Sequence, residues 1–190
     1  MICSTSDVTV CAGDAQLQTI PVGGAVHFLR YDNHSARVYV SGAGFVSVID
    51  ASGIQPVANT TFPVKSVTGL SGNTWVTALA DGTRYYVSES GAHDVKAFDA
   101  TNLNNTTPLA TIDLGAGSTP IMIDSDKNST KVYTANTGSN DFSIIKTLDN
   151  TEVLQTAAGV PPRITPPLLP GCTTSTPTCR QTPTWVTVLP

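Results

Sequence analysis

Charged residues are scarce in this 190-residue sequence, at 13%, and ten Lys or Arg stand against fourteen Asp or Glu. Phosphate contacts need clustered basic side chains, so this shortage argues against nucleic-acid binding. Long apolar runs are missing too: none approaches the roughly 20 residues of a membrane span, and no basic start with an apolar core indicates a signal peptide. Because 40% of the residues are hydrophobic, the composition fits a globular chain and excludes a disordered one.

Helical periodicity is also absent, since no segment places apolar residues at i, i+3, i+4 and i+7 over a usable length. Instead, short phrases rich in Val, Ile, Tyr, Phe and Thr recur between turn residues, a pattern typical of β-strands. The tyrosines of one phrase, Tyr39, Tyr86 and Tyr133, are 47 residues apart in both intervals. Three further phrases recur beside it, which gives four strands per unit. The four phrases lie at 26–29, 75–79 and 121–123; at 37–40, 84–87 and 131–134; at 46–50, 95–99 and 142–146; and at 17–23, 109–115 and 153–159.

Four short strands in every 47 residues match the arithmetic of a β-propeller blade. A lone four-stranded sheet leaves two apolar faces in water, and packing of blades around an axis buries both. The sequence therefore predicts an all-β fold, a β-propeller of four-stranded antiparallel blades. The predicted parts are a partial blade at 1–23, complete blades at 24–68, 69–115 and 116–160, a Pro-rich insertion at 161–183, and the first strand of a next blade at 184–190.

Turn chemistry fits these units. Asp81-Gly82 lies between the first and second strands of its unit, where a tight hairpin favours positive φ. Asp50 and Asp99 end third strands, where a carboxylate accepts N–H groups of the following turn. Lys146 stands at the same place in the next unit, so the cap is either lost there or supplied by Asp149.

The phrases resemble the YVTN-type β-propeller repeat family, whose second-strand signature is written here as Tyr39-Val40-Ser41, Tyr86-Val87-Ser88-Glu89 and Tyr133-Thr134-Ala135-Asn136. Residues 136–145 are most similar to the linked second and third strands of that family. The resemblance covers about residues 4–160 and the final eight residues, and it is specific for the fold. It implies a ring of about seven blades, and it implies little about activity. Family members include cell-surface proteins, and related propellers carry lactonase or lyase sites.

The strand count leaves two arrangements open. Two strands precede the first complete blade and one follows the third, fifteen in all, which is one fewer than a four-bladed ring needs. One interpretation is a fragment of a longer propeller, forming an open arc. The other is a small ring, or an arc completed by another copy of the chain. Open blade edges would invite self-association.

The cysteines predict an oxidising compartment, because their number is even and the chain is β-rich and poor in lysine. Cys172 and Cys179 bracket a polar loop and are expected to form a local disulfide, and Cys3 and Cys11 are a second candidate pair. The alternative for Cys11 is a small buried hydrophobe. No motif indicates a bound metal or cofactor, so none is predicted. We expect an extracytoplasmic protein, secreted or at the cell surface.

Candidate binding residues lie in the loops between second and third strands, which meet near the axis of a propeller. They are Glu89, His93, Asp94, Asn136, Asn140 and Asp141. Such carboxylates and an imidazole suit a metal site or an acid–base pair, and the competing interpretation is that they shape tight turns. No catalytic residue is predicted, since neither a nucleophile elbow nor a phosphate loop is present.

Two function classes follow. The favoured one is a non-catalytic extracellular propeller scaffold that binds a protein or glycan through its loops or forms part of a surface assembly. The alternative is a propeller-type extracytoplasmic lyase or lactonase with a metal site near the axis. Whether the chain is an enzyme is thus left open, with the balance towards a binding role.

Overall fold

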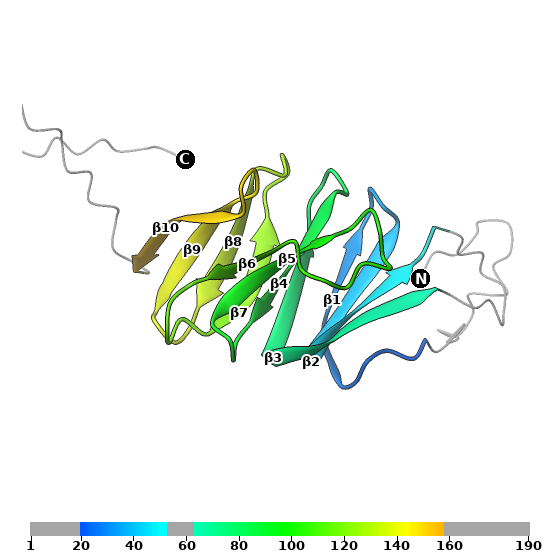
Figure 1. The fold of residues 1–190 in the computed structure, drawn as a ribbon, viewed down its shortest axis with the longest axis horizontal. Helices are drawn as coiled ribbons and strands as arrows, with labels where there is room; N and C mark the ends of the chain where they lie inside the picture. Colours follow the sequence, from blue (N-terminus) through cyan, green and yellow to red (C-terminus); the bar gives the residue numbers. More distant parts are fainter. Residues whose placement is uncertain (1–19, 53–62, 158–190) are drawn as a thin grey trace, which may run out of the picture. The chain divides into compact units, whose positions relative to one another are not determined.

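The structure is a computed structural model that describes residues 20–52 and 63–157 (Figure 1). The chain divides into a unit of residues 1–159 and a unit of residues 160–190, and all described residues belong to the first. The predicted cystines, the N-terminal partial blade apart from residues 20–23, the Pro-rich insertion and the strand at 184–190 lie outside the described residues. No helix in the described part is long and apolar enough to cross a bilayer.

Every regular element in the described part is a β-strand, which confirms the all-β prediction. The ten strands form two antiparallel sheets with the orders β1-β2-β3-β4-β5-β6 and β10-β9-β8-β7, and neither sheet closes on itself. Their bounds are β1 Val26–Asp32, β2 Arg37–Asp50, β3 Val64–Ala78, β4 Arg84–Glu89, β5 Asp94–Asp99, β6 Ala110–Asp113, β7 Pro120–Ser125, β8 Lys131–Asn136, β9 Asp141–Lys146 and β10 Thr151–Ala157.

The second and third repeat units each hold four consecutive antiparallel strands. Residues 74–78 of β3 pair with β4, and β5 and β6 follow. In the other sheet β7, β8, β9 and β10 pair in chain order. The four-strand count per repeat is therefore confirmed for these two units.

The first repeat unit differs from the expected meander. Two separate strands were predicted around Gly42-Ala43-Gly44, but residues 37–50 form the single strand β2, whose first part pairs with β1 and whose second part pairs with β3. Four-residue turns separate the matching strands elsewhere, whereas this connection has only three residues. Gly44 takes a φ of 76° and shifts the register as a bulge, so the chain bends without reversing. The predicted boundary between the first two units, at residues 68 and 69, falls inside the single strand β3. Residues 64–68 of β3 pair with β2 and residues 74–78 pair with β4, and this strand joins the two units into one six-stranded sheet.

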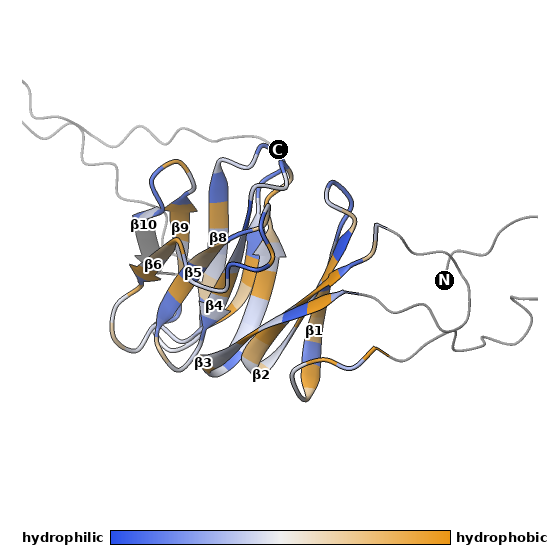
Figure 2. Cartoon of the chain, turned by 45° about the vertical axis from the view of Figure 1, so that its right-hand side comes forward, coloured by the Kyte–Doolittle hydropathy of each residue, from blue (hydrophilic) through white to orange (hydrophobic). Residues whose placement is uncertain are grey.

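Two buried clusters hold the strands, and both depend on the adjacent residues Tyr85 and Tyr86. Because successive side chains of a strand point to opposite faces, Tyr85 packs with Tyr39 and Phe98, at ring-centroid distances of 5.2 and 5.1 Å. Tyr86 lies in the other cluster with Val132 and further residues of the β7–β10 sheet. Each fully buried aromatic side chain contributes about 2 kcal/mol. Figure 2 shows the hydrophobic bands along the strands and the hydrophilic residues at many of the turns.

Carboxylates cap the turns as the sequence predicted. Asp50 Oδ1 accepts the Ser52 backbone N–H at 2.9 Å, and Asp99 Oδ1 accepts that of Thr101 at 2.7 Å. In the unit where Lys146 stands at this place, Asp149 Oδ1 accepts the Thr151 hydroxyl at 2.7 Å, so Asp149 supplies the cap. These hydrogen bonds lower the pKa of all three carboxyl groups.

Candidate functional site

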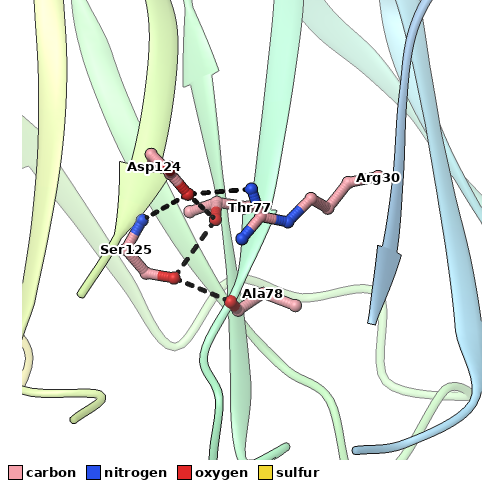
Figure 3. A network of polar contacts seen from close by, with 5 residues as sticks. All are labelled: Arg30, Thr77, Ala78, Asp124 and Ser125. Carbon is pink, nitrogen blue, oxygen red and sulfur yellow. Dashed lines mark hydrogen bonds and ion pairs between the residues drawn. The ribbon is translucent and has the colours of Figure 1, made fainter. Parts of the chain in front are cut away.

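The first strands of the three repeat units bring three polar side chains together (Figure 3). Arg30 in β1, Thr77 in β3 and Asp124 in β7 are 47 residues apart in each interval. Arg30 Nη1 lies 2.9 Å from Asp124 Oδ1, and Thr77 Oγ1 donates to the same oxygen at 3.4 Å. These three residues, together with Ser125, are called the hub here.

Ser125 fixes the hub to the backbone of β3. Its hydroxyl donates to the Ala78 carbonyl at 2.9 Å and lies 3.3 Å from Thr77 Oγ1. Thr77 is fully buried, whereas the side chains of Arg30 and Asp124 are 38% and 64% exposed. The hub is thus a water-accessible pair of opposite charges above a buried hydroxyl, and an exposed pair of this kind stabilises by at most about 1 kcal/mol.

None of the hub residues was among the predicted site residues. The signal that would have found them is the 47-residue interval itself: equivalent positions of first strands come close to one another when sheets fan about a common line. Three chemically different side chains, a cation, a hydroxyl and an anion, occupy this one repeat position.

Glu89, the first predicted loop carboxylate, ends β4 with no exposed surface. Its Oε1 pairs with the ammonium of Lys96 on the neighbouring strand β5, and its Oε2 accepts the Ser71 backbone N–H at 2.6 Å. Both oxygens are therefore occupied by groups of the protein itself. This carboxylate fastens the bend of β3 to the β4–β5 hairpin.

Asp94 begins β5 beside that ion pair. Its Oδ2 lies 4.0 Å from Lys96 Nζ, and its Oδ1 is buried without a hydrogen-bond partner. Burial, and then the negative charge of Glu89, raise the pKa of the Asp94 carboxyl to about 6. Among the predicted residues, Asp94 has the most perturbed environment.

His93 and Asn140 occupy equivalent turn positions, with φ values of 62° and 55°. The His93 ring accepts the Thr119 backbone N–H at Nδ1, at 3.3 Å. The Thr119 carbonyl in turn accepts the Thr137 backbone N–H at 3.1 Å. Residue 119 therefore links the two predicted loops, while the side chains of the loops do not converge on one another.

Asn136, Asp141 and Ser143 form a second version of the Glu89 arrangement, in which an amide takes the place of the carboxylate and a hydroxyl the place of the ammonium. Asn136 Nδ2 donates to Asp141 Oδ1 at 2.6 Å and to Ser143 Oγ at 2.8 Å. Asn136 and Ser143 are equivalent to Glu89 and Lys96, each 47 residues further along. The same contact between neighbouring strands is thus made by an amide and a hydroxyl in one sheet and by an ion pair in the other.

No group of three or more His, Cys, Asp or Glu in the described part could hold a metal ion. Of the carboxylates considered for an acid–base pair, Glu89 is engaged on both oxygens, whereas Asp94 has an unpartnered Oδ1 and a pKa raised to about 6 but is only 8% exposed. Of the six predicted residues, exposed Asn140 is the one most available to an outside partner.

No protein-family model matches this sequence, and no curated protein does. A solved structure with a similar fold is titled hydrazine synthase from Kuenenia stuttgartiensis, with a TM-score of 0.54 and 17% sequence identity. The similarity covers 69% of this chain and 35% of that chain, so this chain spans about a third of the neighbour's length. At this identity the likeness concerns the fold alone.

Proposed function

We propose that the three repeat units are successive blades of a β-propeller and that the protein is a non-catalytic binding or assembly module outside the cytoplasm. The observation that carries the propeller is a contact that recurs from one repeat unit to the next. Arg37 donates to the Ala100 carbonyl, and Arg84 Nη1 donates to the Thr147 carbonyl at 2.6 Å. Both donor and acceptor move by 47 residues, which is the signature of equal units stacked in one direction.

A further observation supports the stacked arrangement. First strands of all three units meet at the hub, as innermost strands do around a propeller axis. The YVTN-type resemblance belongs to the same proposal and rests on the repeated phrases of the sequence.

The non-catalytic role rests on the loops. Glu89 and His93 are used internally, by the ion pair with Lys96 and by the hydrogen bond that His93 accepts, and Asp94 is only 8% exposed. What remains for a partner is the exposed turn at residues 137–140, with its backbone groups, hydroxyls and the amide of Asn140. Neutral hydrogen-bonding groups of this kind suit a glycan or a protein surface. The extracytoplasmic location is proposed from the even number of cysteines and the low lysine content.

A metal measurement on the purified chain separates this role from a metal-dependent lyase or lactonase. We expect less than 0.1 equivalent of bound Ca²⁺, Mn²⁺ or Zn²⁺ after dialysis, and no change in Glu89→Gln. Stoichiometric metal that is lost in Glu89→Gln would overturn the non-catalytic proposal.

A glycan array tests the binding surface. Asn140→Gly removes the amide and keeps the positive φ, and Ala36→Gly is the matched control, because Ala36 has a φ of 51° in the β1–β2 turn. We expect any glycan signal to fall at least tenfold in Asn140→Gly and to stay unchanged in Ala36→Gly. A signal that both variants retain would exclude this turn as the binding site.

A further inference from the structure

Three equivalent tyrosines differ in their burial. Tyr39 and Tyr86 have no exposed surface, whereas Tyr133 is 38% exposed. Tyr39 packs against Tyr85 of the following repeat unit, and Tyr86 packs in the cluster that contains residues of the β7–β10 sheet. Tyr133 points to the side where a following sheet would lie, and among the described residues no sheet covers it.

The residues around Tyr133 repeat this difference. Phe142 is 37% exposed, while its equivalents Val46 and Val95 are fully buried. Met122, on the neighbouring strand, is 60% exposed. Together with Ala135 these side chains line a shallow groove of about 310 Å³. Strands that face water alternate apolar and polar residues, so an apolar outer face on β7–β9 indicates a partner. Met122, Tyr133 and Phe142 are called the trailing face here.

At the other end of the repeat units, the first strand β1 exposes the apolar residues that its equivalents bury. Val76 and Ile123 are buried in first strands, each in the cluster that holds the tyrosine 37 residues earlier in the chain. Leu29 is equivalent to both and is 58% exposed, and Tyr31 beside it is 52% exposed. Leu29 and Tyr31, both on β1, are called the leading face here. Within residues 20–52 and 63–157, Tyr133 therefore has no first-strand partner and β1 has no tyrosine packed against Leu29.

A polar contact between repeat units shows the same gap. Arg37 and Arg84 donate to the carbonyls of Ala100 and Thr147 in the next unit. The equivalent donor in the last sheet is Lys131, which is exposed. The equivalent acceptor in the first unit is the Ala51 carbonyl. Its equivalence follows from backbone hydrogen bonds: the N–H groups of Ala51, Ala100 and Thr147 donate to the carbonyls of residues 36, 83 and 130, and these three acceptors are 47 residues apart.

We propose that the trailing face binds the leading face of a second copy of this chain, head to tail. Leu29 of the second copy packs on Tyr133 as Val76 packs with Tyr39 and Ile123 with Tyr86, and Lys131 donates to its Ala51 carbonyl. The inference rests on the stacked-sheet arrangement proposed above and is independent of what the loops bind. The interface continues one that the chain already makes internally, which is why the second copy is the expected occupant. The competing occupant of the trailing face is the first strand predicted at residues 184–190 of the same chain, and a chain closed in that way stays a monomer.

Such a contact joins two different patches, so it is heterologous: the assembly ends when the ring closes, and otherwise grows. If two copies close a ring, each contributes its stacked sheets in turn, and the particle has twice the mass of one 19.8 kDa chain. A contact of one patch with itself would give a dimer of a different symmetry.

A mixing experiment distinguishes the two contacts. Tyr133→Glu disables the trailing face and leaves the leading face intact, and Leu29→Glu does the reverse. Leu148→Glu is the matched control, since Leu148 is an apolar residue, 80% exposed, in the β9–β10 turn outside both faces. Light scattering coupled to size exclusion measures the mass of each protein at 50 µM, and thermal unfolding verifies that each is folded.

We expect the wild-type chain and Leu148→Glu to be dimers or larger, and each face variant alone to be a monomer. An equimolar mixture of the two face variants regains a dimer, because each supplies one intact face. A folded wild-type chain that stays a monomer overturns the inference and leaves the propeller proposal standing. A mixture that stays monomeric, or face variants that each remain oligomeric, also overturns it.

Discussion

Replacing Asp94 with Asn should stabilise the protein at neutral pH, because its carboxylate is buried with a missing partner. The residue is 8% exposed, its Oδ1 accepts no hydrogen bond, and the neighbouring Glu89 carries a charge of the same sign. Lys96 offsets this only in part, since its ammonium belongs mainly to Glu89 and lies 4.0 Å from Asp94. Burial therefore costs the ionised form more than the neutral form.

The sign and size follow from the raised pKa. Burial raises the pKa of Asp94 from its ordinary value of 3.8 to about 6. Below pH 3.8 the group is neutral in both states and the penalty is absent; the penalty grows between pH 3.8 and pH 6, where the unfolded chain is ionised and the folded protein still holds the proton, and it is complete above about pH 6. Each pKa unit corresponds to about 1.4 kcal/mol, so the whole penalty is about 3 kcal/mol. For a chain of this size that is a rise in melting temperature of roughly 9 °C.

Thermal unfolding of Asp94→Asn and wild type between pH 3.5 and pH 8 is the assay. We expect no difference at pH 3.5 and the full gain above pH 7. Asp99→Asn, at the other end of β5, is the control of opposite sign: hydrogen bonds from Thr101 lower the pKa of Asp99, so that variant loses stability at neutral pH and matches wild type in acid. A gain for Asp94→Asn that is equal at pH 3.5 and pH 8, or a loss at pH 8, would refute the reasoning.

Three further substitutions test the packing and the contacts between sheets, each by chemical denaturation. Phe98→Ala should cost about 3–5 kcal/mol, because it leaves a cavity beside the stacked ring of Tyr85; a cost below 1 kcal/mol would contradict this cluster. Arg84→Met should cost about 1–3 kcal/mol through the lost hydrogen bonds to Thr147 and Asn150, and an unchanged midpoint would count against the repeated contact. Gly138→Ala should cost more than Gly117→Ala, because a Cβ at residue 138 would overlap the Gly117 carbonyl and lie 2.6 Å from Thr119 Oγ1. Gly117 has open space and a φ of 87°, so its replacement should cost only about 1 kcal/mol; equal costs would disprove the close approach at Gly138.

Strand identity and spacing were readable from the sequence because each phrase carries its own turn chemistry. Asp99 and Asp81 were predicted at turns, and their carboxylates accept the N–H groups of Thr101 and Thr83. The continuity of β2 was not predicted. A Gly-x-Gly connection is compatible with a hairpin or a bulge, and the choice depends on pairing with β3, which is a long-range contact.

The candidate site was predicted less well, for an identifiable reason. The loop around Glu89 and Asp94 was found by its residue types, and its partner Lys96 lies on the next strand, where cross-strand register decides the contact. The local sequence shows which side chains carry reactive groups, and the pairing register of neighbouring strands decides which of those groups already have a partner within the protein. The hub could not be predicted for the same reason, because its contacts join residues that are 47 positions apart (Thr77 and Asp124) and 94 positions apart (Arg30 and Asp124).

Positions that repeat and positions that vary carry different information in this chain. A repeated contact, such as that of Arg37 and Arg84, is explained by stacking and needs no ligand. A repeat position whose residue changes type cannot owe its identity to stacking alone. The hub is such a position: a uniformly structural role would favour one residue type in all three first strands, yet Arg30, Thr77 and Asp124 are chosen to pair with one another. Exchange of Arg30 and Asp124 in a double variant should therefore keep the ion pair, and loss of stability beyond that of either single variant would show that the surroundings, more than the pair, select these residues.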